Sequence, residues 1–355
     1  MKVNVPTISV MMPLYNTKKY VQQAVDSILN QTFKDLEVVI VDDGSTDGSY
    51  ELCQSLYGRD KRVRMFRHEK NQGPALTRND AIRNTRGKYL AFLDSDDIFL
   101  PEFCETLYKI AEKENAEVVS TTGYLISDGD EIPKEGKGLS NIGLDGVPPV
   151  TETKYMTPYP PHSDYFQMIQ MKLDNYLRGA YGFACCFNKL YLKEFIMRHN
   201  IFCTKKAEDM FFVFQCMLHA ERYIKVPKML NVYRNLSSST SRNLPSFEDL
   251  QKRLKSMNGL LSEFDNYMKD IDFFIQNPHY RFAVLEFVLT IMDNHSMNRY
   301  YPTGQGIIPF VLEGANQEIE KIYGENAPLV KCLFHRSHLL YQQNLELIAK
   351  IQSQS

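Results

Sequence analysis

Three aspartates lie within one short turn of this 355-residue sequence. Asp94, Asp96 and Asp97 directly follow the apolar run Tyr89–Leu93. Like charges at this spacing raise one another's proton affinity unless a cation or hydrogen-bond donors neutralise them. A hard divalent ion such as Mg²⁺ or Mn²⁺ suits carboxylate oxygens and usually keeps open positions for substrate phosphates. The cluster therefore indicates a metal-assisted reaction on a phosphorylated substrate. The alternative, above all for Asp97, is a cap for the helix that Pro101 opens.

A second acidic cluster follows another apolar run. Leu36–Val41 leads into Asp42 and Asp43, with Gly44 next. Ligands of an open α/β sheet bind outside the carboxyl ends of its strands, so we expect both acidic clusters at one crevice. Residues 45–47 (Ser, Thr and Asp) are expected to cap the next helix.

The first 122 residues alternate strand and helix signals, which is typical of a mostly parallel sheet covered by helices on both faces. We expect strands at Ile8–Met12, Leu36–Val41, Val63–Phe66, Tyr89–Leu93 and Glu117–Thr122, and helices at 18–30, Ser49–Tyr57, Ala75–Asn84 and from Pro101.

The pattern changes after residue 122. Residues 127–161 are rich in glycine, proline and charge and have no sustained periodicity, which indicates an inserted loop or flap. From about Pro245 the pattern is helical and has no strand runs. Between these segments we expect helices near Ser163–Leu177, from about Tyr191 and near Glu208, and strands near Gly182–Phe187, Tyr223–Val226 and Leu230–Tyr233.

The composition narrows the partners and the compartment. A net charge of −2 gives no global field that would attract nucleic acid. No apolar run approaches the ~18 residues that span a bilayer, and the chain start lacks a signal-peptide core. Seven cysteines without metal-ligand spacing indicate reduced thiols in the cytoplasm. Contact with a membrane would need a local basic patch. One candidate basic face contains Arg222, Lys225, Lys228, Arg234 and Arg242. The alternative is that these residues form an ordinary solvated surface.

Five short blocks carry a resemblance to a known family. They are PLYN at 13–16, VDDGSTDGS at 41–49, NQGPALTRNDA at 71–81, FLDSDD at 92–97 and ED at 208–209. In order and spacing they resemble the family 2 glycosyltransferases with the GT-A fold, a Rossmann-like nucleotide-diphospho-sugar transferase fold. With the patterns above, this predicts an α/β domain over 1–244 and a helical region over 245–355. Within the domain, 1–122 would bind the nucleotide, 123–162 would be the insertion, and 163–244 would hold the acceptor and the catalytic group.

The resemblance implies how the donor, a nucleoside-diphosphate sugar of UDP type, is held. Asp43 would accept a hydrogen bond from the base, Asp94 would hold the ribose, and Asp96 would ligate the Mn²⁺ or Mg²⁺ that bridges the diphosphate. Arg78 would lie beside the base and diphosphate, with a surface helix arginine as the alternative. The other residues implied in nucleotide-sugar binding are Pro13, Tyr15, Asn16 and Ser95.

The resemblance also implies the chemistry. Asp209 would be the general base that takes the proton of an acceptor hydroxyl as its oxygen attacks the anomeric carbon. The attack would invert that carbon, so an α-linked donor would give a β-linked product. Glu208 would support the loop or touch the acceptor, and Arg234 would meet the diphosphate, with a surface salt bridge as its alternative. An acid pair that merely begins a helix is the alternative for Asp209.

The sequence contains no tryptophan, so the Q-x-x-R-W block of processive synthases is absent and transfer of a single sugar is expected. Family analogy suggests a glycan or lipid-linked glycan acceptor in cell-surface polysaccharide synthesis. The helical region 245–355 is left with three roles: acceptor binding, homodimer formation, or peripheral contact with the inner membrane leaflet.

Other classes fit less well. A dehydrogenase would need G-x-G-x-x-G after the first strand, and an aspartate-type phosphoryl-transfer protein would need a carboxylate there. A nucleotidyltransferase would carry a glycine- and lysine-rich loop, which is missing. A non-catalytic sugar-nucleotide scaffold would not need the full acidic set. The histidines His68, His162 and His219 lack partners at convincing spacing and are expected to be satisfied or exposed.

Overall fold

The computed structural model divides the chain into two compact units, residues 1–236 and 237–355. It describes residues 5–127, 138–139, 154–155, 169–170, 172–173, 185–204, 208–234, 236, 259–281, 283–285 and 287–288. In the second unit, the described residues include a helix over 259–268 and α9, Asp272–Gln276.

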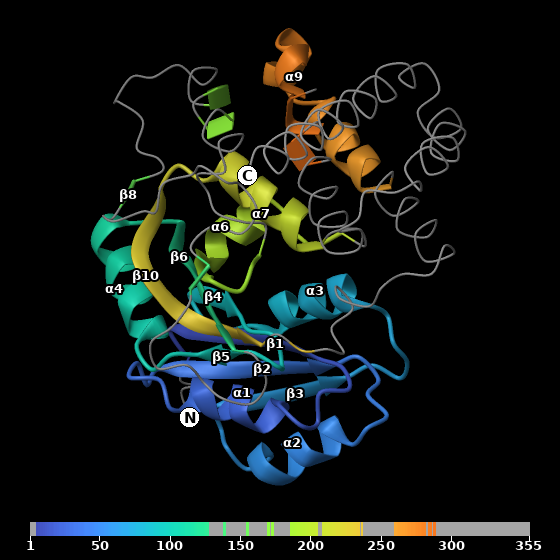
Figure 1. The fold of residues 1–355 in the computed structure, drawn as a ribbon, viewed down its shortest axis with the longest axis vertical. Coiled ribbons are helices and arrows are strands. Elements are labelled where there is room, and N and C mark those ends of the chain that lie inside the picture. The colour runs from blue at the N-terminus through green and yellow to red at the C-terminus, as the bar shows by residue number, and fades with distance from the viewer. Residues whose placement is uncertain are drawn as a thin grey trace, which may run out of the picture. The chain divides into compact units, whose positions relative to one another are not determined.

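One sheet organises the first unit, with strand order β3-β2-β1-β4-β9-β6-β10-β5 (Figure 1). β1, β2, β3 and β4 run parallel, as do β6 and β10, whereas β9 is antiparallel to both of its neighbours. The expected mostly parallel sheet is therefore confirmed. The strands are β1 Ile8–Leu14, β2 Leu36–Asp42, β3 Val63–Arg67, β4 Tyr89–Phe92, β5 Ile98–Phe99, β6 Val118–Ser127, β7 Gly138–Leu139, β8 Lys154–Tyr155, β9 Lys189–Leu192 and β10 Tyr223–Arg234.

Helices cover both faces of the strands β1–β3. In Figure 1, α1 and α2 lie below these strands and α3 lies above them. The apolar stripe of α1 (Val21, Ala24, Val25 and Ile28) is fully buried, and all seven residues of β2 are buried. Each large apolar side chain buried in this way contributes about 1.5–3 kcal/mol. The described helices of this unit include α1 Val21–Leu29, α2 Ser49–Tyr57, α3 Pro74–Asn84, α4 Phe103–Glu114, α6 Lys193–Arg198 and α7 Glu208–His219.

The strand register brings the two acidic clusters to one edge of the sheet. Leu14 pairs with Asp42, so β1 and β2 end together, and Met11 pairs with Phe92 at the end of β4. β1 lies between β2 and β4, so the chain leaving β4 at Leu93 and the chain leaving β2 at Asp43 follow parallel strands on either side of β1. Both acidic clusters therefore follow the carboxyl ends of parallel strands in one sheet, as the positions of the two apolar runs predicted.

Several predicted elements differ from the structure. Of the strand expected near Gly182–Phe187, residues 185–187 are not in a strand and 182–184 lie outside the described residues; the described strand here is β9. Its first residue, Lys189, is buried, and its amine donates to Cys185 O (2.7 Å) and Asn188 Oδ1 (2.6 Å). The helix expected from Tyr191 begins at Lys193. The two strands expected between 223 and 233 form one strand, β10, because register shifts around Pro227 and Lys228 absorb the break in the pattern.

Other differences concern the helix after the aspartates and the insertion. Helix α4 begins at Phe103 rather than at Pro101, and the short strand β5 before it was not predicted. Strand β6 runs to Ser127, past the expected end at residue 122. Of the helix expected over 163–177, residues 169–170 and 172–173 are helical, and the rest lies outside the described residues.

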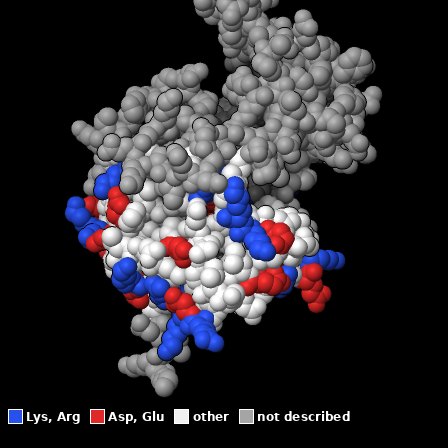
Figure 2. Space-filling view, turned by 60° about the horizontal axis from the view of Figure 1, so that its bottom comes forward, with Lys and Arg blue, Asp and Glu red and all other residues white. Residues whose placement is uncertain are grey.

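Charged side chains on the first unit are mixed in sign. On the face in Figure 2, basic and acidic residues lie close together around a mostly uncharged centre. The basic face expected from the sequence is wrong for Lys225 and Arg234, because both side chains are buried. Arg222 and Lys228 are exposed, and Arg242 lies outside the described residues. Within the described parts of the chain, no helix has the length and apolarity to cross a bilayer.

Glu37 is a buried carboxylate that stabilises the sheet away from the acidic clusters. It accepts hydrogen bonds from Ser9 Oγ (2.7 Å) and from the backbone N and Nε of Arg86 (both 2.8 Å). Burial alone would raise the pKa of Glu37, but the hydrogen bonds from Ser9 and Arg86 outweigh burial and lower it.

We expect Glu37→Gln to lower the free energy of unfolding by about 2–3 kcal/mol, because the Arg86 guanidinium loses its buried counter-charge. Since the folded pKa lies below the unfolded pKa, this contribution is complete above the unfolded value, about 4.3, and disappears as the pH falls through the folded pKa. Urea denaturation at pH 7 and at pH 3–4 measures the difference. The matched control is Glu105→Gln, which breaks an exposed pair with Lys109 and should leave stability unchanged.

Candidate active site

Asp43 is held by three hydrogen bonds at the end of β2. Its Oδ1 accepts from His68 Nδ1 (2.8 Å) and from the backbone N of Gln72 (2.8 Å), and its Oδ2 accepts from the backbone N of Gly73 (2.9 Å). An ionised carboxylate has about four acceptor positions, so three are filled. The side chain is almost fully buried, and its orientation is therefore fixed by the segment 68–73.

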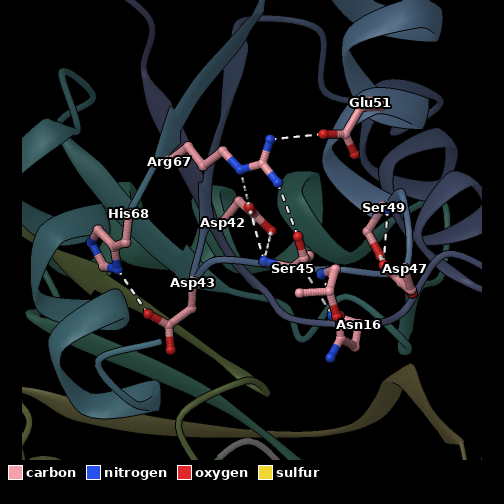
Figure 3. A network of polar contacts seen from close by, with 10 residues as sticks. Asn16, Asp42, Asp43, Ser45, Asp47, Ser49, Glu51, Arg67 and His68 are labelled. Atoms are coloured by element: carbon pink, nitrogen blue, oxygen red, sulfur yellow. Dashed lines mark hydrogen bonds and ion pairs between the residues drawn. The ribbon is translucent and has the colours of Figure 1, made fainter. Parts of the chain in front are cut away.

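Asp42 and Asp47 make polar contacts with their neighbours in and beside the turn after β2 (Figure 3). Asp42, with no exposed surface, contacts Arg67 Nε at 3.0 Å and accepts from Ser45 N. Asp47 accepts from the backbone N of Ser49, the first residue of α2, at 2.9 Å, although the N-cap residue of this helix is Gly48. Ser45 does not cap α2, because its hydroxyl accepts from the backbone N of Asn16 (3.0 Å).

Asn16 and Ser95 connect the loop after β1 to both acidic clusters. Asn16 lies in the left-handed region (φ 52°), and its Oδ1 accepts from the backbone N of Thr46 at 2.9 Å. Thr17 Oγ1 donates to Ser95 Oγ at 2.8 Å. Tyr15, just before Asn16, is 48% exposed and can present its ring to a ligand. Pro13 pairs with Val41 in the sheet and is partly buried.

Arg78 joins the two halves of the site. From α3, its Nη2 donates to Asp94 Oδ1 at 2.9 Å, and its Nη1 lies 3.4 Å from Asp209 Oδ1. The side chain is only 6% exposed, so the alternative of a surface helix arginine is wrong. One guanidinium thus brings together two carboxylates that are far apart in the sequence.

Asp209 lies in the first turn of α7 and is partly exposed. Besides Arg78, its Oδ1 contacts Cys186 Sγ at 3.1 Å. Burial, and after it the charge of Asp209, raises the pKa of the Cys186 thiol well above its ordinary value. The thiol therefore stays protonated and can donate to the carboxylate. The side chain of Glu208 lies outside the described residues.

Asp96 and Asp97 are electrostatically crowded. Burial, and after it the charge of Asp94, raises the pKa of Asp96 to about 6 despite Arg78 and Arg234 nearby. Burial and the neighbouring aspartates raise the pKa of Asp97 well above its ordinary value. Among the residues that the structure describes, Asp97 Oδ2 has no hydrogen-bond partner, and no three His, Cys, Asp or Glu side chains gather as a complete metal site. The crowding at Asp96 fits a cation that completes its coordination with substrate oxygens.

Arg234 is buried at the end of β10. Its backbone N donates to Asp97 Oδ1 at 2.9 Å, its Nη2 donates to Gln23 Oε1, and its guanidinium lies 5.2 Å from the centre of the Tyr20 ring. A surface salt bridge is therefore the wrong interpretation for Arg234. Capping is also wrong for Asp97, because its carboxylate faces β10 instead of the start of α4.

Two residues beside the site were given no functional role from the sequence. Cys186 is a buried thiol beside Asp209, and no disulfide joins the described cysteines. His68 was expected to be satisfied or exposed, and it is satisfied by two carboxylates. The sheet offered a signal for it: Arg67 pairs with Asp42 in register, so the next residue, His68, comes beside Asp43.

The other two histidines noted in the sequence lie away from the two acidic clusters or outside the described part of the chain. His219 stacks on His199, with 4.6 Å between the ring centres. His162 lies outside the described residues.

Comparison with known proteins agrees with this geometry. The family model described as "Glycosyl transferase family 2" matches residues 9–199. "Glycosyltransferase GlyG" of Streptococcus pneumoniae serotype 4 is 41% identical over 123 residues, which are 35% of this chain and 41% of that protein. "Putative glycosyltransferase EpsH" of Bacillus subtilis is 28% identical over 288 residues, 76% of this chain and 74% of that protein. The match thus spans less than half the length of GlyG.

Solved structures identify the fold. The crystal structure of S. aureus TarS 1–349 in complex with UDP-GlcNAc superposes with a TM-score of 0.65 at 18% identity, covering 95% of this chain and 92% of that one. This likeness confirms the GT-A fold class expected from the sequence blocks.

Proposed function

The chain belongs to glycosyl transferase family 2, and on this premise we propose that it transfers one sugar, with inversion, from a UDP-sugar to a hydroxyl of a glycan or glycolipid acceptor. One observation carries the proposal: Arg78 holds Asp94 from the donor-side loop and Asp209 from α7 on a single guanidinium. This contact puts a carboxylate suited to proton transfer next to the loop that would hold the diphosphate. The choice of uridine is supported by the TarS structures, which contain UDP-GlcNAc and UDP.

The donor would be held by groups that are already fixed. Asp43 has about one acceptor position left, which suits the imide N–H of uracil, and the exposed Tyr15 ring follows the neighbouring strand end. Asp94 would accept from the ribose hydroxyls while Arg78 neutralises it. The Arg78 fork suits phosphate oxygens as well as carboxylates, which favours a contact with the diphosphate.

Asp96 would hold the divalent ion, Mn²⁺ or Mg²⁺. When bound, the ion supplies Lewis-acid stabilisation of the diphosphate leaving group. Arg234 is buried behind Asp97 and would act by fixing the loop 94–97 rather than by touching phosphate. Ser95, tied to Thr17, would fix the same loop from the other side.

Asp209 would act as the general base. Its carboxylate takes the proton of the acceptor hydroxyl, the hydroxyl oxygen forms a bond to the anomeric carbon, and the bond from that carbon to the diphosphate oxygen breaks. Arg78 and Cys186 hold one oxygen of Asp209, so the carboxylate keeps one orientation during the transfer. Because the attack comes from the face opposite the leaving group, the product has the inverted anomeric configuration.

The finer assignments belong to the same proposal. Residues 163–244 would provide the acceptor side, and Glu208 would support its loop or touch the acceptor. The acceptor would be a growing cell-surface glycan, on the cytoplasmic side of the membrane. The region 245–355 would bind acceptor, form a homodimer or contact the inner leaflet.

Donor hydrolysis without acceptor tests the proposal directly. We expect a panel of nucleotide sugars to bind by calorimetry with a preference for one UDP-sugar, and slow release of UDP that requires Mn²⁺ or Mg²⁺. Proton NMR of the released sugar should show the β-anomer first from an α-linked donor. Binding without any turnover would instead indicate a scaffold, and release of pyrophosphate from a nucleoside triphosphate would indicate a nucleotidyltransferase.

A further inference from the structure

His68 bridges two carboxylates from different elements. Its Nδ1 lies 2.8 Å from Asp43 Oδ1, and its Nε2 lies 3.1 Å from Asp80 Oδ2 on α3. The side chain is 11% exposed, so water competes little for either nitrogen. Figure 3 shows the imidazole directed at Asp43, with Arg67 directed away toward Asp42 and Glu51.

This arrangement selects the charged form of the ring. A neutral imidazole has one N–H and one lone pair, so it can donate to only one of two carboxylates. The imidazolium donates to both. Burial works against the charge, but the hydrogen bonds to Asp43 and Asp80 outweigh it and raise the pKa of His68 above its ordinary value.

The His68 ring belongs to the segment 68–73, which surrounds the Asp43 carboxylate. The backbone N of His68 donates to Asp42 O (2.8 Å), and the same segment supplies the backbone donors at residues 72 and 73. A side chain at Gly44 would meet the backbone of Lys70 at 3.0 Å, so the segment lies directly on the turn after β2. The orientation of Asp43 therefore depends on where residues 68–73 lie.

We propose that His68 is a positioning residue for the donor site: as an imidazolium it ties Asp43 to α3 through Asp80, and its deprotonation weakens the binding of a uridine nucleotide. This rests on the proposed role of Asp43 toward the base. The charged groups that face the ring are Asp43 after β2 and Asp80 on α3. Arg83, one turn further along α3, pairs with Asp80 Oδ1 at 2.9 Å and would draw Asp80 away once the ring is neutral.

The direction of the pH dependence follows from the raised pKa. In the folded protein the ring is an imidazolium at pH values below its raised pKa, and its effect on UDP binding is lost as the pH rises through that pKa. Each unit of pKa shift corresponds to about a tenfold change in the linked equilibrium.

Calorimetric titration of UDP with Mg²⁺ from pH 6.5 to 9 tests the proposal. We expect His68→Gln to bind UDP roughly five- to tenfold more weakly than wild type at pH 6.5 and about equally at pH 9. The ratio of the two Kd values is the quantity to follow, because the ionisations of UDP are common to both proteins. Asp80→Asn should bind UDP nearly as tightly as wild type at pH 6.5. As the pH rises, it should lose affinity at a lower pH than wild type does.

Controls separate this inference from the proposed function. His199→Gln removes a histidine that stacks on His219 and should keep the wild-type pH profile. Proton NMR of the His68 ring gives a second readout, with a titration midpoint that falls in Asp80→Asn. A constant Kd ratio across the pH range, or an unchanged midpoint, would overturn the inference alone. If the wild-type protein fails to bind UDP at every pH, the proposed donor fails and the inference with it.

Discussion

The Asp209→Asn protein should bind UDP-sugar as wild type does and transfer almost none of it. A general base contributes roughly 10²–10⁴-fold to the rate, so kcat should fall by about that factor. The asparagine side chain keeps an Oδ1 that can accept from Cys186 Sγ and Arg78 Nη1, so the local structure should persist. Transfer assays at saturating donor, with Kd for UDP measured alongside, separate the two effects.

The matched control for this variant is Glu194→Gln, which removes an exposed carboxylate from α6. Its kcat and Kd should match the wild-type values. Normal transfer by Asp209→Asn would show that another group takes the acceptor proton. A fall in UDP affinity as large as the fall in kcat would instead point to a role in binding the donor.

The Asp96→Ala protein should lose metal-dependent donor affinity. With Mn²⁺ present, we expect UDP to bind roughly 10–100-fold more weakly, and without metal the variant and wild type should bind alike. Calorimetry with and without EDTA measures both conditions. Because burial and Asp94 raise the pKa of Asp96 to about 6, its ionisation lowers the stability of the metal-free fold as the pH rises from the unfolded value of about 3.9 to about 6, and this cost persists at higher pH. Adding Mn²⁺ with UDP should therefore raise the Tm of wild type more than that of the variant.

The Asp97→Asn protein is the comparison for Asp96→Ala. The substituted amide is neutral, yet its oxygen can still accept from the backbone N of Arg234. Its metal-dependent UDP affinity should remain within about threefold of wild type, a change of under ~1 kcal/mol. If the two variants lost affinity equally, Asp96 would not be the particular ligand of the ion.

The parts of the fold that follow from periodicity were predictable. β2 is buried on both faces and is a continuous apolar run, and α1 carries one clear stripe. The elements that were misplaced contain polar residues whose burial depends on tertiary partners. Lys189 can be buried because Cys185 O and Asn188 Oδ1 accept hydrogen bonds from its amine. No local sequence pattern contains that information.

The candidate site shows the same division. The strand ends predicted that Asp43 and Asp94 would share one edge of the sheet, since the ligands of an open α/β sheet bind outside the carboxyl ends of its parallel strands. The interaction partners could not be predicted, because Arg78, Cys186 and Arg234 reach the aspartates across long sequence separations. Both readings of Arg234 left it accessible, on the surface or against the diphosphate. It is buried because the Tyr20 ring, Gln23 and Asp97 surround its polar groups.

The antiparallel strand β9 has a consequence for protein engineering. It lies between β4 and β6 and pairs with both. A segment close to Asp209 in the sequence is therefore part of the same sheet as the strand that leads into the loop 94–97. A chimera of two relatives that is joined after β6 would take β9 from one parent. Its sheet partners β4 and β6 would then come from the other parent. A graft that moves residues 185–204 together with 89–127 keeps β9 with its two partner strands. Crossover points in recombination libraries should therefore lie outside those two stretches.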